Sequence, residues 1–273
     1  MGYTMDADYT AHAYSANTSG AMTELDSLGQ RGEMQAMAVN DSGAVLSCLY
    51  DYNWDDYAAI FTYAFVQANG QTCSLNSVDE VVDLAPGLRR KILGANDINN
   101  LGQIVGMSGL YAVELGDWGI PLGCVGGDPI MNYDPVRALL YTPGSAPIEL
   151  GVLPGYGSIS EAMAVNDLGQ VVGYSEFENC PLGDASAAFL YSDGRMYDLN
   201  MLVDASAQGS MLTEAYGINN KGQIIAYGSR RKGNEWLYGT FLLTPVPEPS
   251  SLVVLFSGLT AAASVALRRK NRR

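Results

Sequence analysis

Four segments of the chain repeat one pattern of apolar and polar positions. In each, an apolar run leads into a turn of the form Asn-Asp/Asn-x-Gly, and a second apolar run follows the turn. The turn glycines supply the positive φ needed by a type I turn followed by a left-handed residue. β-branched and apolar residues on both sides favour strands. The pattern therefore predicts four β-hairpins at residues 36–46, 95–106, 162–173 and 215–226, with turn glycines Gly43, Gly102, Gly169 and Gly222.

A second hairpin pattern lies between these four. Its clearest copy has the strand Ala188-Phe189-Leu190-Tyr191, the turn Asp193-Gly194 and the strand Met196-Tyr197-Asp198-Leu199. Alternating apolar residues around a Gly-containing turn are typical of a hairpin. Further copies fall at 63–84 and 138–150, an N-terminal copy at 12–25, and a C-terminal copy at 239–242 that has no second strand.

Together the two hairpins form a unit of four antiparallel strands, which we call s1 to s4. Stacked four-stranded units of this kind predict an all-β, repeat-built β-propeller-like domain. Three units are complete, with s3–s4 left over at the N-terminus and s1–s3 at the C-terminus. The two remnants would join as a fourth blade by circular closure, or there are five blades if residues precede the first. A β-sandwich or β-prism of the same hairpins is the alternative.

The half-units resemble the extracellular HAF repeat, which is named for a His-Ala-Phe strand. His12-Ala13-Tyr14 comes closest to that triplet, and the other copies lack the histidine. The resemblance covers roughly residues 10–243. It implies an extracellular repeat protein, and it brings no biochemical activity that could be transferred to this chain.

The C-terminal residues combine three features in 27 positions. Pro247-Glu248-Pro249 precedes an apolar run, Leu252 to Leu267, and five basic residues lie in 268–273. The 18 uncharged residues 250–267 would span roughly 27 Å as a helix, enough for a thin hydrocarbon core. By the positive-inside rule the C-terminus is cytoplasmic and residues 1–246 lie outside. We therefore expect an exported domain at 1–243, a Pro-rich linker at 244–251, and a single transmembrane helix with a basic cytoplasmic tail at 252–273.

This tail resembles the PEP-CTERM sorting signal of bacteria that make exopolysaccharide. The resemblance implies that an exosortase-type membrane protease recognises Pro247, Glu248 and Pro249 and releases the protein outward. The protein would then be anchored transiently in the inner membrane before it reaches the cell surface or the extracellular space. The alternative is an ordinary C-terminal anchor that is never cut.

Charge and rare residues limit the function classes. Without the five basic residues of the tail, the net charge of −14 becomes −19, which argues against nucleic acid and anionic membrane surfaces as partners. The only histidine, His12, leaves few His-dependent catalytic schemes. There is no CxxC or Cys/His cluster for zinc, and we expect no cofactor. Outside the cytoplasm, four cysteines suggest up to two disulfides among Cys48, Cys73, Cys124 and Cys180.

One feature does not fit export: residues 1–20 contain no apolar core of a signal peptide. We therefore expect the signal peptide in a segment upstream of this sequence.

Insertions between s2 and s3, near 47–63, 107–137, 175–187 and 228–238, predict a loop-rich face at one end of the blades. Aromatic rings there would stack on sugar rings, while carboxylates would bind hydroxyls or Ca²⁺. The alternative is that the aromatics plug the blade ends and the acids keep the protein soluble. The candidate ligand-binding residues are Trp54, Trp118, Trp236, Tyr52, Asp51, Asp55 and Asp56.

The functional prediction is a non-enzymatic binding or structural protein of the cell surface or matrix, associated with extracellular polysaccharide. The alternative is a carbohydrate-active enzyme on the same scaffold, with two loop carboxylates as its catalytic pair. No nucleophile elbow, phosphate loop or HExxH motif is present in the sequence to support other enzyme classes.

Overall fold

A computed structural model describes residues 2–5, 11–16, 19–25, 33–52, 60–75, 88–112, 136–157, 159–177, 186–204 and 209–246. The chain divides into two compact units, residues 1–243 and residues 244–273. The second unit is described only through Val246, so the fold below is that of the first unit.

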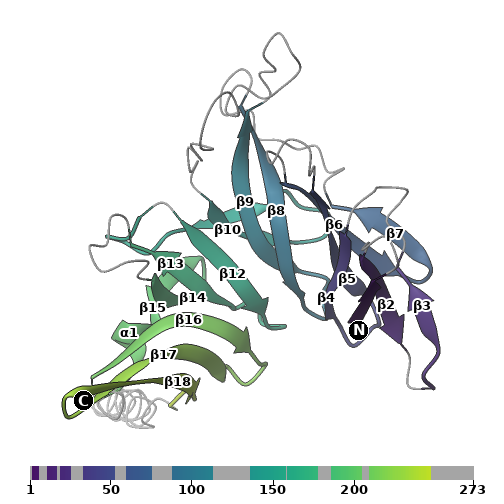
Figure 1. Cartoon of the computed structure of the whole chain (residues 1–273). Helices are drawn as coiled ribbons and strands as arrows, with labels where there is room; N and C mark the ends of the chain where they lie inside the picture. Colours follow the sequence, from purple (N-terminus) through teal and green to yellow (C-terminus); the bar gives the residue numbers. More distant parts are fainter. Residues whose placement is uncertain are drawn as a thin grey trace, which may run out of the picture. The chain divides into compact units, whose positions relative to one another are not determined.

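The described strands form five antiparallel sheets, each built from strands consecutive in the chain (Figure 1). The first sheet contains β1 (Gly2–Met5), β2 (Ala11–Ala16) and β3 (Met22–Glu24). The second contains β4 (Glu33–Val39), β5 (Val45–Tyr52), β6 (Ile60–Ala68) and β7 (Gln71–Ser74). The third contains β8 (Leu88–Ile98), β9 (Ile104–Ala112), β10 (Arg137–Tyr141) and β11 (Ile148–Gly151).

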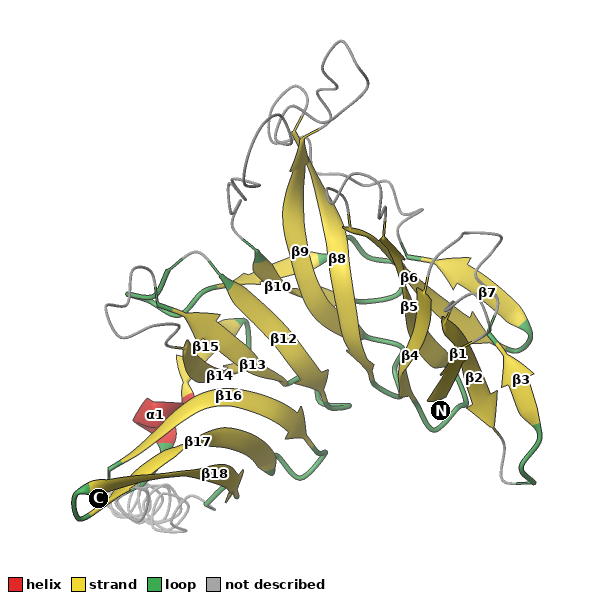
Figure 2. Ribbon diagram, viewed as in Figure 1, coloured by secondary structure: helices red, strands yellow, loops and turns green. Residues whose placement is uncertain are grey.

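The fourth sheet contains β12 (Ser160–Val165), β13 (Val171–Glu176), β14 (Ser186–Ser192) and β15 (Arg195–Asp198). The fifth contains β16 (Ser210–Ile218), β17 (Ile224–Lys232) and β18 (Glu235–Leu243). Among the described residues the single helix is the short α1 (Leu199–Leu202), shown in red in Figure 2. Its cap is Asp198, whose side chain accepts the N–H of Asn200 at 2.8 Å.

The all-β class and the four-stranded up-and-down units are confirmed. The joining of the two terminal remnants into one blade is wrong, because each remnant forms its own sheet. β1 pairs with β2, so the N-terminal copy has its own s2 strand and cannot share that of the last copy. No helix within the described ranges is long and apolar enough to cross a membrane. The predicted span at 252–273 lies outside those ranges.

The predicted turn geometry is also confirmed. Gly43, Gly102, Gly169 and Gly222 have φ of 81°, 74°, 74° and 72°. The first turn closes with a bond from the N–H of Gly43 to the carbonyl of Asn40 (3.0 Å), and the other three turns repeat it. The N–H of each turn asparagine then bonds across to the first residue after its glycine. The four turns therefore present the same backbone in the same register.

Each s1 strand carries a bulge at the same place, with Met37, Asn96, Met163 and Tyr216 as the extra residues. A bulge bends its strand and brings the backbone close to the partner strand. A Cβ on Gly106 would lie 2.1 Å from the carbonyl oxygen of Gly94, and one on Gly173 would lie 1.9 Å from that of Glu161. Glycine therefore fits these two s2 positions of the third and fourth sheets, whereas Ser47 and Ala226 occupy the equivalent positions of the second and fifth sheets.

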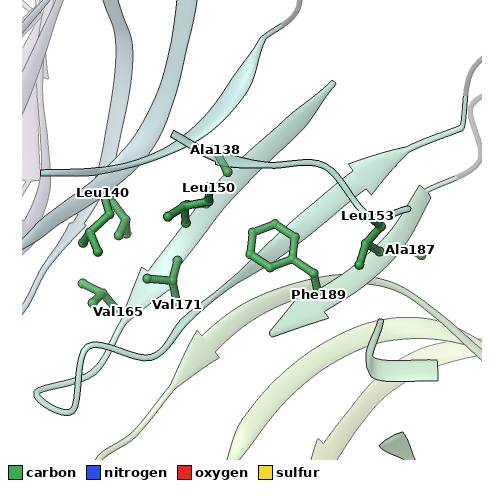
Figure 3. Close-up of a cluster of buried hydrophobic side chains, with 10 residues drawn as sticks. Ala138, Leu140, Leu150, Leu153, Val165, Val171, Ala187 and Phe189 are labelled. Atoms are coloured by element: carbon green, nitrogen blue, oxygen red, sulfur yellow. The ribbon is translucent and has the colours of Figure 1, made fainter. Parts of the chain in front are cut away.

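Apolar side chains fill the space between successive sheets in four buried clusters. In the cluster between the third and fourth sheets, Phe189 lies between Val171 and Leu153 (Figure 3). A strand with packing on both faces needs consecutive apolar residues, because neighbouring side chains point to opposite faces. The start of each s2 strand provides such a pair, for example Val171 toward the third sheet and Val172 toward the fifth.

The second members of these pairs show where the packing stops. Leu46, Val105 and Val172 are each 0% exposed, because the following sheet covers them. Ile225 occupies the same position in the last hairpin and is 48% exposed. In contrast, the first member, Ile224, is buried like its counterparts. The described part of the first unit therefore ends in a sheet that is covered on one face only.

Candidate functional site

The hairpin turns are bonded to one another through their first asparagines. The side-chain amide of Asn40 donates to the carbonyl oxygen of Asn99 (3.0 Å), that of Asn99 to Asn166 (2.9 Å), and that of Asn166 to Asn219 (3.0 Å). We call this row the asparagine ladder. It fixes turns that are 53 to 67 residues apart in the chain next to one another.

Each asparagine also organises its own turn. Asn166 Oδ1 accepts the N–H groups of Leu168 and Gln170, both at 3.0 Å, and Nδ2 donates to Gln170 Oε1 at 2.8 Å. Asn166 is buried, so these contacts replace water around its amide. Asparagine suits the position because one short side chain supplies an acceptor and a two-proton donor. Aspartate would lack the donor.

The second turn residues form a parallel row in which acids and amides alternate: Asp41, Asn100, Asp167, Asn220. Asn100 Nδ2 donates to Asp41 Oδ2 (2.9 Å) and to Asp167 Oδ2 (3.0 Å), and Asn220 Nδ2 donates to Asp167 Oδ2 (2.7 Å). Backbone N–H groups add a second set of bonds along the row, from Asp41 to Asn100, Asn100 to Asp167 and Asp167 to Asn220. We call this the alternating row.

Two aspartates at these junctions have pKa values shifted in opposite directions. The pKa of Asp167 lies below its ordinary value of 3.8, because the N–H and amide of Asn100 and the amide of Asn220 bond its carboxylate. The pKa of Asp97 lies above the ordinary value, because burial outweighs the N–H bonds from Val165 and Ile98. Asp97 Oδ2 accepts the N–H of Val165 at 2.9 Å and so connects the third and fourth sheets.

These polar groups join successive sheets. Within the ranges the structure describes, no group of three or more His, Cys, Asp and Glu residues could hold a metal ion. The sequence carried a signal for this network, which is Asn at the first turn position of every copy and Asp/Asn alternation at the second. Within a single repeat, these residues indicate only a turn.

The structure moves three predicted ligand-binding residues from loops into strands. Asp51 and Tyr52 are the last residues of β5, and Trp236 lies in β18. The prediction of a loop at 228–238 is wrong, since β17 and β18 run through it and pair Arg231 with Trp236. The predicted insertion at 47–63 is shorter than expected for the same reason, because β5 and β6 extend into it.

The remaining residues of the predicted ligand-binding face cannot be placed together. Trp54, Asp55, Asp56 and Trp118 lie outside the described residues, as do the sorting-motif residues Pro247, Glu248 and Pro249. Trp236 is 50% exposed. A common face for the three tryptophans therefore stays a prediction.

The cysteines differ in their surroundings. Cys48 is a buried free thiol of β5 that donates to the carbonyl oxygen of Ala95 (3.4 Å), and burial raises its pKa to about 11. Cys73, in β7, is an exposed free thiol. Cys124 and Cys180 lie outside the described residues. Cys48 and Cys73 therefore form no disulfide with each other, the other predicted pairings stay predictions, and Cys48 is a core residue where a loop position was expected.

The side of the fifth sheet that faces away from the fourth sheet is apolar and aromatic. Because Ile224, Ala226, Phe241 and Leu243 pack toward the fourth sheet, the alternate residues of β17 and β18 point away from it. We call these residues the outer face: Ile225, Tyr227, Trp236, Tyr238 and Leu242. They are between 39% and 71% exposed.

Comparison with known proteins identifies one segment of the chain. Residues 245–270 match the model of the PEP-CTERM protein-sorting motif. This match confirms the expected sorting signal and indicates an exported protein that is targeted to exosortase, a membrane protease, and delivered to the cell surface or extracellular space. No curated protein matches the chain, and no solved structure matches it.

Proposed function

We propose that this protein is a non-enzymatic component of the cell surface or extracellular matrix that binds extracellular polysaccharide. The observation that carries the proposal is the sorting motif at 245–270, which directs the protein outward. Before processing, the apolar segment within 252–273 anchors the chain transiently in the inner membrane. Exosortase then separates it from the exported domain.

The exported domain fits this role as a scaffold. Its five sheets are proposed to be HAF-type repeats and to act as blades of a propeller-like array. The asparagine ladder and the alternating row support a rigid arrangement, because they bond turns from successive sheets. Polysaccharide binds at the loops on the opposite ends of the s2 strands, where β5 leads into Trp54, Asp55 and Asp56.

The sorting step is tested by mass and location. We expect full-length protein made with exosortase to lose the segment after the Pro247-Glu248-Pro249 motif and to appear outside the cell. Without the protease, or with all three motif residues changed to Ala, it should stay intact in the membrane fraction. Intact mass spectrometry of each fraction gives the answer. A tail that stays uncut both with and without exosortase would identify a plain anchor and refute release by exosortase.

Polysaccharide binding is tested separately by co-sedimentation with the producing strain's own purified polymer. Trp54→Ala combined with Trp118→Ala should reduce the bound fraction at least about fivefold, since stacked aromatic rings contribute much of the sugar contact. Tyr197→Ala is the matched control, because Tyr197 is an exposed aromatic residue of β15 and is not one of the predicted ligand-binding residues. Equal binding by both variants would refute the loop site.

A further inference from the structure

The outer face of the fifth sheet resembles the faces on which successive sheets of this chain pack. Within each of the second, third and fourth sheets, the residue equivalent to Ile225 is fully buried under the next sheet. Leu242 pairs with Ile225 across the strands, as Leu190 pairs with Val172 in the fourth sheet. Leu190 and Val172 are both covered by the fifth sheet. The outer face therefore repeats the apolar pattern that this chain uses at its internal sheet junctions.

The hydrogen bonds of the asparagine ladder all run in one direction, from each turn to the next along the chain. The last donor of the ladder lies at the fifth sheet. Asn99 and Asn166 each use one amide proton within the turn and one on the next copy, whereas the amide of Asn219 donates, among the residues that the structure describes, to Gln223 Oε1 alone (2.9 Å). At the opposite end, the carbonyl oxygen of Asn40 accepts only the N–H of Gly43 among the described residues. Within the described residues, the ladder therefore ends with a spare amide proton of Asn219 at the fifth sheet and, at the second sheet, with the Asn40 carbonyl, which bonds only inside its own turn.

Charge is distributed with the same polarity. Residues 209–243 contain four basic and two acidic residues, a net charge of +2, while residues 1–208 contain 26 acidic and six basic residues, a net charge of −20. The first 25 residues include three acids and no base. Opposite charge at the two ends favours contact of one end with the other.

We propose that the outer face of the fifth sheet docks on the N-terminal end of a second copy of this chain, head to tail. Burial of Ile225, Tyr227, Trp236, Tyr238 and Leu242 supplies the apolar contact, as at the internal junctions. Two fifth sheets do not dock on each other, because that would oppose two donor ends and two basic sheets. A head-to-tail contact that does not close builds open-ended assemblies.

The experiment is sedimentation velocity of the full chain in a nonionic detergent over a concentration series. The wild type should grow beyond two copies without reaching a plateau. Ile225→Glu should raise the dissociation constant at least about tenfold, because docking would bury an unpaired carboxylate. Ile148→Glu is the matched control, since Ile148 in β11 is 50% exposed and lies outside the outer face. Association through the apolar tail is common to all variants and cancels in the comparison.

A second variant checks the role of charge. Arg231→Glu with Lys232→Glu should also weaken association, and added salt should weaken it in the wild type. Equal far-ultraviolet circular dichroism of the Ile225→Glu and Ile148→Glu proteins excludes misfolding. Equal association of these two variants would overturn the proposal. So would a plateau at two copies, or wild-type association that comes from the apolar tail alone. None of these outcomes depends on whether exosortase cuts the tail or the loops bind sugar.

Discussion

Val172 and Ile225 occupy the same position in neighbouring repeats, yet the first is fully buried and the second is 48% exposed. Their strands begin alike, with Val171-Val172 and Ile224-Ile225 after a Gly-Gln pair. What differs is the neighbour: Val172 lies under the fifth sheet, whereas no described sheet covers Ile225. The comparison shows that the sequence of each repeat has apolar residues for packing against a neighbouring sheet on both faces. Equivalent changes in the fourth and fifth sheets should therefore have unequal effects on stability.

The largest difference is expected at two glycines. Gly173→Ala should lower the free energy of unfolding by roughly 3 kcal/mol, because its Cβ would overlap the carbonyl of Glu161 and force the bulged strand to shift. Gly239→Ala in β18 should be within about 0.5 kcal/mol of wild type, since no atom lies within 4 Å of its Cβ. Urea denaturation of the full chain measures both. Similar losses would mean that the chain is as closely packed around Gly239 as around Gly173.

The next largest difference in stability is expected between Val172 and Ile225. Val172→Ala should cost roughly 2 kcal/mol, from two lost methyl groups and the cavity they leave. Ile225→Ala should cost about 1 kcal/mol or less at protein concentrations where copies are apart. The same denaturation series gives the comparison. If Ile225→Ala proves as costly as Val172→Ala under those conditions, the outer face must be covered within a single chain.

The ladder should show the same inequality. Asn166→Ala removes four hydrogen bonds around a buried side chain and should cost roughly 2 kcal/mol. Asn219→Ala removes only the bonds of its own exposed turn and should cost about 1 kcal/mol. Hydrogen exchange of the backbone amides near each turn would show whether the loss spreads to the neighbouring repeat. Spread from Asn219 but not from Asn166 would contradict the direction of the ladder.

The smallest effect is expected from pH. The lowered pKa of Asp167 means that its stabilisation is present above the ordinary value of 3.8 and is lost as pH falls through the lower folded value. Asp97 has the opposite sign, because its raised pKa favours the folded state as pH falls. Asp167→Asn should therefore flatten the loss of stability in acid, whereas Asp97→Asn should steepen it. Urea midpoints between neutral pH and about pH 3 test this, and equal slopes would refute the assignment.

The sequence was sufficient for the hairpins because their determinants are local. Gly102 and Gly169 need positive φ wherever the turn lies, and the paired apolar residues after them need cover on two faces. Five sheets was one of two alternatives from the sequence, and the other, a fourth blade shared by the two termini, failed because residues 2–5 form a strand that pairs with β2. The bulges at Met37 and Met163 depend on contacts with the partner strand and leave no clear mark in the sequence.

The candidate site was less accessible to sequence analysis. The segment 228–238 was expected to be an insertion between strands, yet Arg230, Arg231 and Lys232 lie at the exposed end of β17, where a strand tolerates charge. Trp236 was placed in a loop for the same reason, although it lies in β18. The bonds between Asn40, Asn99 and Asn166 link residues that only folding brings together, so the motif predicted four turns but not their connection.

The alternation of Asp41, Asn100, Asp167 and Asn220 amounts to a parity rule for the growth of this architecture. Adding or removing one repeat inside the array would place two carboxylates or two amides side by side, where like charges repel or donors face donors. Adding or removing two repeats would keep every acid beside an amide. Duplication of a pair of repeats is therefore the unit of change that this fold accepts without a compensating mutation, and a designed longer version should be extended in steps of two.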